Sequence, residues 1–339
     1  MIRLSCTYYL ECADQPRKHI LPVHRSIVRN LFVGIFLCLT FLFSNIRFCV
    51  LDVHADPKDY YRLVILGDPH LPGKEVPAKE DTLKTINSWN DVDRVVVLGD
   101  ICYGLGTRDE YAYARRFFSP LKKPVCFING NHDYIYDDVA DPKDKKTKAS
   151  ADIRERKLRL FKETFNLPEL YYSIKAGNYF LIFLSADDLE SNDLVRISEG
   201  QLNWLRSALD RNKEFPTLLF SHAPLKGTLY PYNERVNTTH YVIQPEERIR
   251  ELIRQNPQIF LWVSGHTHTP ATSESYASEI NLYEKQVTNI HTCDMNRKTI
   301  WTNSLYLYPE KVFVRTFDHR KGTWMNHLER IILPPGRQP

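Results

Sequence analysis

Short runs of branched and aromatic residues recur along the chain from residue 61 to about residue 265, separated by amphipathic or polar segments. Such runs are typical of strands buried on both faces, and their alternation with helical patterns is typical of an α/β domain. We predict buried strands at residues 62–66, 94–98, 125–128, 179–184, 217–220 and 259–263. Beyond residue 270 the alternation weakens, and residues 304–307 and 312–317 are the expected strands of a second sheet.

Helical periodicity fills the gaps between these strands. Apolar residues on one face predict helices over residues 81–89 and 151–165. Ser198 begins another helix, because Gln201 follows at the spacing of a capping box, and Pro245 opens the last one. Residues 138–150 are polar and rich in Lys and Asp, which predicts an exposed loop whose charges are solvated.

The N-terminal part of the chain has a different composition. Residues 1–30 are basic, and residues 31–43 are almost continuously apolar, about the length of the hydrophobic region of a signal peptide. A small-residue pattern ending at Ala55 is an acceptable cleavage site, but Arg47 lies between it and the apolar run. Residues 31–55 are therefore a signal peptide or an uncleaved anchor through residues 31–51. Either interpretation places residues 56–335 outside the cytoplasm, as an exported or membrane-tethered domain.

Composition narrows the possible functions of that domain. The chain has 339 residues, 43% hydrophobic and 25% charged, which is enough for a large core. Its formal charge of +4 lies partly in the basic N-terminus, so the remainder is close to neutral. This argues against a nucleic-acid partner but not against a small phosphorylated substrate. Outside the leader only Cys102, Cys126 and Cys293 remain, which predicts neither a disulfide framework nor a thiolate metal site.

Polar residues of metal-ligand type follow five of the predicted strands. Because the carboxyl ends of strands in an open α/β sheet form a common crevice, we expect these side chains to converge. A single such histidine is usually an ordinary core or surface residue, whereas five strand ends in order are not explained by chance. The residues are Asp68, His70, Asp100, Asn131, His132, Asp133, His222, His266 and His268.

The donor atoms indicate the kind of site. Imidazoles, carboxylates and an amide oxygen, without thiolate, suit Mn, Fe, Zn or Co better than Mg or Ca. There are more donors than one ion needs, so we expect two divalent or mixed-valence transition metal ions that share a bridging carboxylate. Such a pair is used for in-line displacement at phosphorus.

The five blocks Asp-x-His, Gly-Asp, Gly-Asn-His-Asp, a lone His and Gly-His-x-His resemble the calcineurin-like metallophosphoesterase superfamily over about residues 60–320. The resemblance implies a four-layer α/β/β/α sandwich of two mixed sheets with a dinuclear metal site at the sheet edge. It also implies one ion on Asp68, His70 and His268 and a second on Asn131, His222 and His266, with Asp100 as the bridge.

The same resemblance implies the chemistry. A hydroxide held by both ions would attack phosphorus without a covalent intermediate. His132 would protonate the leaving group, and Asp133 would orient its ring. We therefore expect a metal-dependent phosphoester hydrolase, with a phosphodiesterase acting on a small molecule as the first choice.

Subfamily features leave alternatives open. Residues 198–205 resemble a helix of cyclic-nucleotide-phosphodiesterase-like members, but the same pattern is equally typical of an ordinary amphipathic helix. Tyr103, three residues after Asp100, resembles the iron-ligating tyrosine of purple acid phosphatases, although His70 departs from that pattern and favours a pocket-wall role. Residues 230–241 either frame substrate entry or form a plain surface loop. A purple-acid-type monoesterase, a nuclease and a non-catalytic scaffold are the remaining alternatives.

Overall fold

The computed structural model describes residues 58–140, 143 and 145–336. The predictions made for residues 1–30 and 31–55 lie outside this part of the chain. Among the helices that are described, none is both long and apolar enough to cross a membrane.

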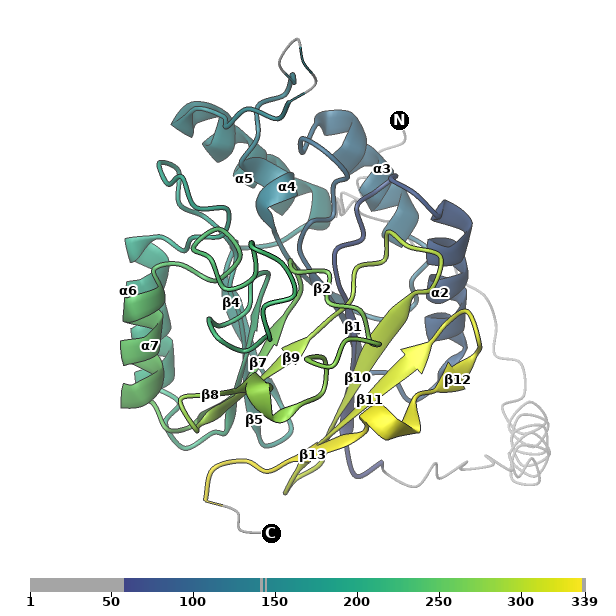
Figure 1. Ribbon diagram of the computed structural model, residues 1–339, viewed down its shortest axis with the longest axis vertical. Helices are drawn as coiled ribbons and strands as arrows, with labels where there is room; N and C mark the ends of the chain where they lie inside the picture. The colour runs from purple at the N-terminus through teal and green to yellow at the C-terminus, as the bar shows by residue number, and fades with distance from the viewer. Residues whose placement is uncertain (1–57, 141–142, 144, 337–339) are drawn as a thin grey trace, which may run out of the picture. The chain divides into compact units, whose positions relative to one another are not determined.

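The first sheet is built around the strand that precedes Asp68. Strands β1, β2 and β3 run parallel, and β10 pairs with β1 in the antiparallel direction (Figure 1). The order is β12-β11-β10-β1-β2-β3, with β13 also paired to β11. The prediction that residues 304–307 and 312–317 belong to a second sheet was wrong, because β10 and β11 extend the sheet of β1. The strands are β1 (Tyr61–Leu66), β2 (Arg94–Leu98), β3 (Val125–Ile128), β10 (Trp301–Leu307), β11 (Val312–Asp318), β12 (Thr323–Trp324) and β13 (Arg330–Ile332).

The second sheet has the order β4-β5-β6-β7-β9-β8. Strands β5, β6, β7 and β9 are parallel, and the edge strands β4 and β8 are antiparallel to their neighbours. Both sheets are therefore mixed. The strands are β4 (Tyr172–Ala176), β5 (Tyr179–Phe183), β6 (Thr217–Ser221), β7 (Ile259–Ser264), β8 (Leu282–Tyr283) and β9 (Val287–His291).

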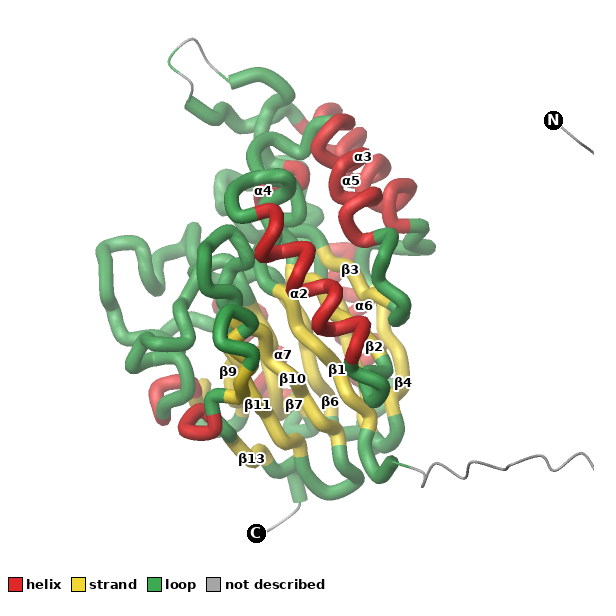
Figure 2. Tube along the Cα trace, turned by 90° about the vertical axis from the view of Figure 1, so that its right-hand side faces the viewer, coloured by secondary structure: helices red, strands yellow, loops and turns green. Residues whose placement is uncertain are grey.

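Helices cover the outer face of each sheet. Apolar residues of α2 (Val76–Ser88), α3 (Arg108–Phe118) and α5 (Ala151–Phe165) pack on the first sheet. Those of α6 (Glu199–Asp210) and α7 (Glu246–Gln255) pack on the second. Helices α6 and α7 lie at the left of Figure 1 and α2 at the right, and Figure 2 shows α2, α3 and α5 lying over one sheet. The short elements α4 (Asn131–Tyr134), η1 (Glu279–Asn281) and η2 (Asn326–Leu328) complete the described structure.

The two sheets face each other across a buried apolar layer. Leu63 and Leu98 of the first sheet belong to the same core cluster as Leu181 and Phe220 of the second. Alternate residues of the central strands point into this layer, and the others point toward the helices, because successive side chains of a strand face opposite ways. Both faces are thus covered, which explains why these strands are apolar without interruption. The predicted four-layer α/β/β/α sandwich with two mixed sheets is confirmed.

Several local predictions hold in part. The Ser198 side chain caps α6 by accepting a hydrogen bond from the Gln201 N–H, as its position predicts. The side chain of Gln201, however, does not return to Ser198 but binds the carbonyl of Ser185 and the carboxylate of Asp187. The helix predicted at residues 81–89 begins earlier, at Val76.

Candidate metal centre

The predicted ligands lie in the loops at the carboxyl ends of five strands. Asp68 and His70 follow β1, Asp100 follows β2, and Asn131 is the first residue of α4 after β3. The second sheet supplies the other three histidines, with His222 after β6 and His266 and His268 after β7. Each sheet therefore contributes part of a single cluster.

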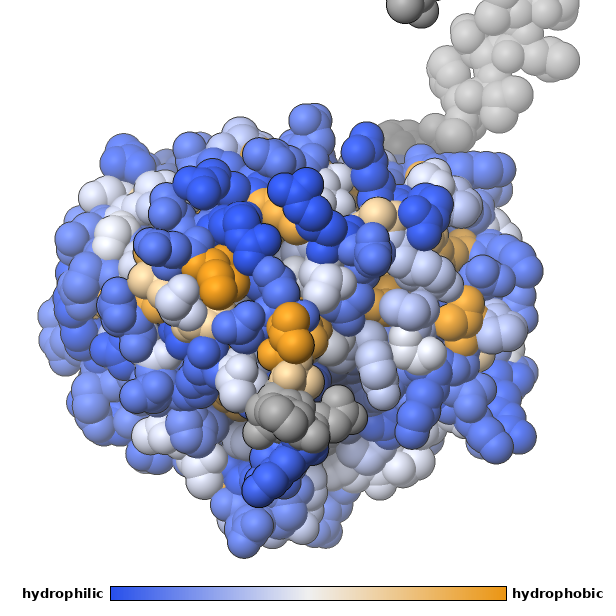
Figure 3. All heavy atoms as spheres, turned by 90° about the horizontal axis from the view of Figure 1, so that it is seen from above, coloured by the Kyte–Doolittle hydropathy of each residue, from blue (hydrophilic) through white to orange (hydrophobic). Residues whose placement is uncertain are grey.

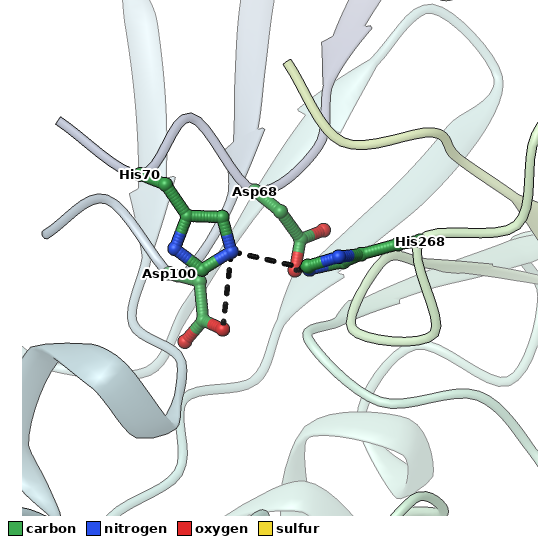
Figure 4. Close-up of side chains that lie close together, drawn as sticks. All are labelled: Asp68, His70, Asp100 and His268. Carbon is green, nitrogen blue, oxygen red and sulfur yellow. Dashed lines mark hydrogen bonds and ion pairs between the residues drawn. The ribbon is translucent and has the colours of Figure 1, made fainter. Parts of the chain in front are cut away.

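The first ligand group contains Asp68, His70, Asp100 and His268, whose donor atoms all lie within 4.8 Å of one another. Figure 4 shows these side chains pointing toward one another from three loops. His70 Nε2 lies 3.1 Å from His268 Nε2 and 3.9 Å from Asp100 Oδ2. His268 Nε2 lies 3.3 Å from Asp68 Oδ1.

The second group contains Asp100, His222 and His266. His222 Nε2 lies 3.3 Å from Asp100 Oδ1 and 3.3 Å from Asn131 Oδ1. Asn131 thus joins this group through its amide oxygen. Asp100 belongs to both groups, as the resemblance implies for the bridging carboxylate.

Backbone carbonyls fix the rings of this second group. His222 Nδ1 lies 2.7 Å from the carbonyl oxygen of Leu98, which leaves Nε2 directed at the cluster. His266 Nε2 lies 2.9 Å from the carbonyl oxygen of His240, which leaves Nδ1 as its ligand atom. Holding the second ring nitrogen in this way sets the tautomer and orientation of a metal-binding histidine.

Unfavourable backbone conformations are concentrated at the ligands. Positive φ is uncommon for residues with a side chain because Cβ crowds the backbone. It nevertheless occurs at five of the seven predicted ligands, which are Asp68, His70, Asp100, His266 and His268, at φ values of 44–64°. Strain of about 1–3 kcal/mol per residue persists only where the surrounding structure enforces it, and it is typical of functional sites.

Two glycines permit the close approach of backbone to ligand. A Cβ on Gly265 would lie 2.2 Å from Asp68 Oδ2, and one on Gly130 would lie 2.4 Å from Asp100 Oδ1. Neither distance is compatible with any other residue. Both carboxylates also accept backbone hydrogen bonds, Asp68 from the N–H of His266 at 3.0 Å and Asp100 from the N–H of His132 at 2.8 Å.

The buried carboxylates draw positive charge into the cluster. Burial alone lowers the pKa of His222, but the Asp100 and Asp68 carboxylates outweigh it and raise this pKa to about 9. Burial likewise opposes protonation of His268, yet its hydrogen bond and charge interaction with Asp68 raise that pKa to about 9. The pKa of His266 falls to about 3, through burial and the nearby charge of His222.

This arrangement fits a pair of divalent cations. Within each group, imidazole nitrogens and carboxylate oxygens converge within 4.8 Å of one another, and the carboxylates raise the pKa values of His222 and His268 because they favour positive charge there. Divalent cations would supply that positive charge and satisfy the converging donors. The donor set, without thiolate, suits Mn, Fe or Zn.

His132 lies beside the cluster with its Nε2 4.0 Å from Asp100 Oδ2. Its Nδ1 lies 3.0 Å from the carbonyl oxygen of Gly104. The buried Asp133 carboxylate has other partners than the expected ring, since it accepts hydrogen bonds from the N–H groups of Cys102 and Gly130. Orientation of the His132 ring is therefore assigned to Gly104, and Asp133 holds the loop backbone on either side of the site.

Comparison with known proteins places this geometry in a family. The family model described as calcineurin-like phosphoesterase matches residues 61–270, more than half of the chain. The chain belongs to the calcineurin-like phosphoesterases. Enzymes of this family are dimetal phosphoester hydrolases, and the candidate ligand cluster of this chain fits that class.

Individual relatives of this phosphoesterase are distant. A curated protein of Fibrobacter succinogenes named "Probable cyclic nucleotide phosphodiesterase" is 26% identical over 163 residues, covering 47% of this chain and 53% of that protein. The match thus spans about half the length of the curated relative. A dimetal phosphatase from Danio rerio has 15% identity and a TM-score of 0.55, with 82% of this chain and all of the other covered. Purple acid phosphatase PPD1 from yellow lupin seeds has 13% identity and a TM-score of 0.53, with 79% and 53% covered.

Two cavities adjoin the candidate metal centre of this phosphoesterase. The surface seen in Figure 3 is mainly hydrophilic, with small separate hydrophobic patches. One has a volume of about 290 Å³ and includes Tyr232 and Tyr241 from the loop at residues 230–241. The other has a volume of about 470 Å³ and includes Tyr103, whose ring centroid lies 6.5 Å from that of His70. Tyr103 is thus placed in the wall of a cavity.

One residue near the site was not predicted. Lys146 lies in the loop at residues 138–150, and its Nζ is 3.0 Å from His132 Nδ1. Its ammonium is also 5.3 Å from the centre of the Tyr136 ring. The sequence shows only a Lys-rich loop, and nothing in its pattern distinguishes the lysine that turns toward the site from the other lysines of the loop.

Proposed function

We propose that this chain is a metal-dependent phosphodiesterase that hydrolyses a small-molecule phosphodiester. The observation that carries the proposal is the pair of cavities beside the metal centre, because both are lined by His132 and His268. A phosphorus atom held between these two histidines has space for a substituent on each side. A monoester would fill only one of the two cavities.

The linings of the cavities favour substituents of different chemistry. The smaller cavity contains the rings of Tyr136, Tyr232 and Tyr241, together with the cationic side chain of Arg235. Flat aromatic walls and one cation suit a planar, polar group such as a nucleobase. The larger cavity contains Lys146 and Tyr103. The name of the Fibrobacter relative points in the same direction.

The roles of the residues follow from their positions. When bound, two cations would supply Lewis acidity and would lower the pKa of a bound water molecule. Asp68, His70 and His268 would hold one cation, Asn131, His222 and His266 would hold the other, and Asp100 would contribute to both. His132 then delivers a proton from Nε2 to the departing oxygen, while Gly104 keeps Nδ1 occupied.

A purple-acid-type phosphomonoesterase is the second candidate, because the lupin phosphatase shares the fold and Tyr103 stands near His70. Tyrosine ligation of iron gives a visible charge-transfer band. A colourless iron-loaded protein would therefore exclude this candidate.

The test is a paired assay on the full 339-residue chain, stripped of metal and reloaded with Mn. We expect bis(p-nitrophenyl) phosphate to be hydrolysed with a higher kcat/KM than p-nitrophenyl phosphate. Preference for the monoester would overturn the diesterase assignment, and absence of metal-dependent hydrolysis of either substrate would overturn the hydrolase assignment.

Asp100→Asn is the control variant for that assay. It preserves the shape of the side chain but removes the negative charge that faces His70, His132 and His222. We expect hydrolysis to fall to background and the bound Mn to fall by at least one equivalent, measured by elemental analysis. Unchanged turnover would show that the reaction does not use a shared carboxylate.

We propose further that residues 56–335 act outside the cytoplasm, exported or tethered through residues 31–51. The basic residues before the apolar run support this topology. Protease accessibility of the domain in intact cells tests it, and full protection would contradict it.

A further inference from the structure

The segment at residues 294–297, between β9 and β10, holds the backbone of one ligand group. Its first contact is with the loop that follows β1. The N–H of Met295 lies 3.1 Å from the carbonyl oxygen of Gly67 and 3.2 Å from that of Asp68. Residues Gly67 and Asp294 also form an isolated parallel bridge. The main chain at Asp68 is therefore fixed by the 294–297 segment.

A second contact reaches His70 through a buried ammonium. Lys79 of α2 has no exposed surface, and its Nζ donates to the carbonyl oxygens of His70 at 3.1 Å and Pro72 at 3.3 Å. The same Nζ donates to Asn296 Oδ1 at 3.1 Å. A buried cation is stable only when its donors are satisfied, and here Asn296 supplies the third acceptor. The 294–297 segment and α2 thus hold His70 together.

The third contact fixes His268. Nη2 of Arg297 donates to the carbonyl oxygen of His268 at 3.0 Å. Asp294 anchors that guanidinium, with Arg297 Nε 2.6 Å from Asp294 Oδ1. Because the planar guanidinium binds a carboxylate and a carbonyl at once, its position is set by both.

All three contacts of the 294–297 segment are with the ligands assigned to one ion or with residues next to those ligands. Asp68, His70 and His268 are the three residues assigned to one ion, apart from the shared Asp100. The other ion's histidines are held elsewhere, His222 by Leu98 and His266 by His240.

We infer that the 294–297 segment positions the ligands of the Asp68–His70–His268 ion. Its effect on the other ion's ligands, which are linked to it through Asp68, should be much smaller. The inference rests on the proposed dimetal centre. Arg297 is the positioning residue to change, since Lys79 is wholly buried and its loss endangers folding. Hydrogen bonds to the side chains of metal ligands change metal affinity by about 10–100-fold, and we take this range for the main-chain contacts of Arg297, which also fix the position of a ligand.

The test uses Arg297→Gln in the full chain, dialysed against a series of free Mn concentrations, with bound metal measured by elemental analysis. We expect one of the two equivalents to bind about 10–100-fold more weakly and the other to bind as in the wild type. Arg297→Lys restores a cation near His268 and should recover part of the affinity. Arg315→Gln is the matched control, because Arg315 is similarly half-buried and paired with Glu329. It should bind both ions normally.

A second variant covers the case in which the unpaired Asp294 disturbs folding. Arg297→Gln combined with Asp294→Asn removes both charges, and it should show the same weakening at one site. Equal weakening at both sites, or none at either, would overturn the inference. A wild-type protein that binds no Mn would instead overturn the proposed metal centre, so the two failures are distinguishable.

Discussion

Replacing His132 with Gln tests the proposed proton donor. The Nε2 atom lies 4.0 Å from Asp100 Oδ2, and Nδ1 lies 3.0 Å from the carbonyl oxygen of Gly104. Lys146 Nζ lies equally close to Nδ1, at 3.0 Å, so the ring donates to Gly104 only in the tautomer that carries a proton on Nδ1. In that tautomer a protonated ring has only Nε2–H to transfer. Glutamine reaches a similar position but carries no proton that it can release near neutral pH.

The size of the effect depends on the leaving group. General acid catalysis contributes about 10²–10⁴-fold, or ~2.7–5.4 kcal/mol. The His132 side chain keeps 19% of its surface exposed, so water can partly replace it, and we expect a loss in the lower half of this range. An aliphatic alkoxide needs the proton and should show that loss. A p-nitrophenoxide is stable as an anion, and its release should slow by less than about tenfold.

The assay compares kcat/KM for two diesters of the same alkyl phosphate, one releasing p-nitrophenol and the other an aliphatic alcohol. The exposed His327, outside both cavities, gives the matched control His327→Gln, which should behave as the wild type. Equal losses for the two leaving groups in His132→Gln would refute the acid role, because they would indicate a defect in binding or folding instead.

Two further predictions concern stability. Arg62 is buried, with Nη1 2.6 Å from Asp91 Oδ1 and its guanidinium 4.4 Å from the Trp89 ring, so Arg62→Met should cost about 2–4 kcal/mol in urea unfolding. The exposed Lys84→Met should show no measurable change. Burial lowers the pKa of His291 from 6.5 to about 3. On acidification His291 therefore takes up a proton in the unfolded chain before it does so in the folded protein. The contribution of the neutral, buried His291 to the free energy of unfolding is complete above about pH 6.5. It declines toward pH 3, by up to ~1.4 kcal/mol per pH unit. Urea unfolding of His291→Gln at pH 7.5 and pH 5 should show a weaker pH dependence than that of the wild type, and identical slopes would contradict the assignment.

The fold was predictable where local pattern and tertiary structure agree. The buried strands before Asp68, Asp100 and His222 are continuous apolar runs, because both faces of each sheet are covered. Helix α3 was missed although its signal is present, since Thr107 and Glu110 form a complete capping box. Strand β4 was missed because most of its residues are only half-buried and its pattern is not continuously apolar.

The candidate site divides in the same way. The convergence of His222 and His268 was predictable, because each follows a predicted strand and the ends of these strands meet at one edge. The order of the sequence blocks and the spacing of the residues within them were sufficient for this prediction. The partners of Asp133 were not, because they are backbone N–H groups brought close by the fold. Arg297 likewise acts on a carbonyl oxygen, which every residue possesses. Any residue type offers the same backbone groups, so a hydrogen bond to the main chain cannot be predicted from the type of residue that provides them.

The pairing of β1 with β10 has a consequence for biosynthesis. Tyr61 lies opposite Leu307, so one edge of β1 is completed by residues that are synthesised long after it. Until β10 is synthesised, β1 has no partner on that side, and an open apolar strand edge invites association between chains. His266 and His268 also lie far along the chain from Asp68 and His70. The first sheet is therefore completed only after β10 has been synthesised, and the candidate metal centre only after β7, so a nascent chain that has released β1 exposes an unpaired edge until then.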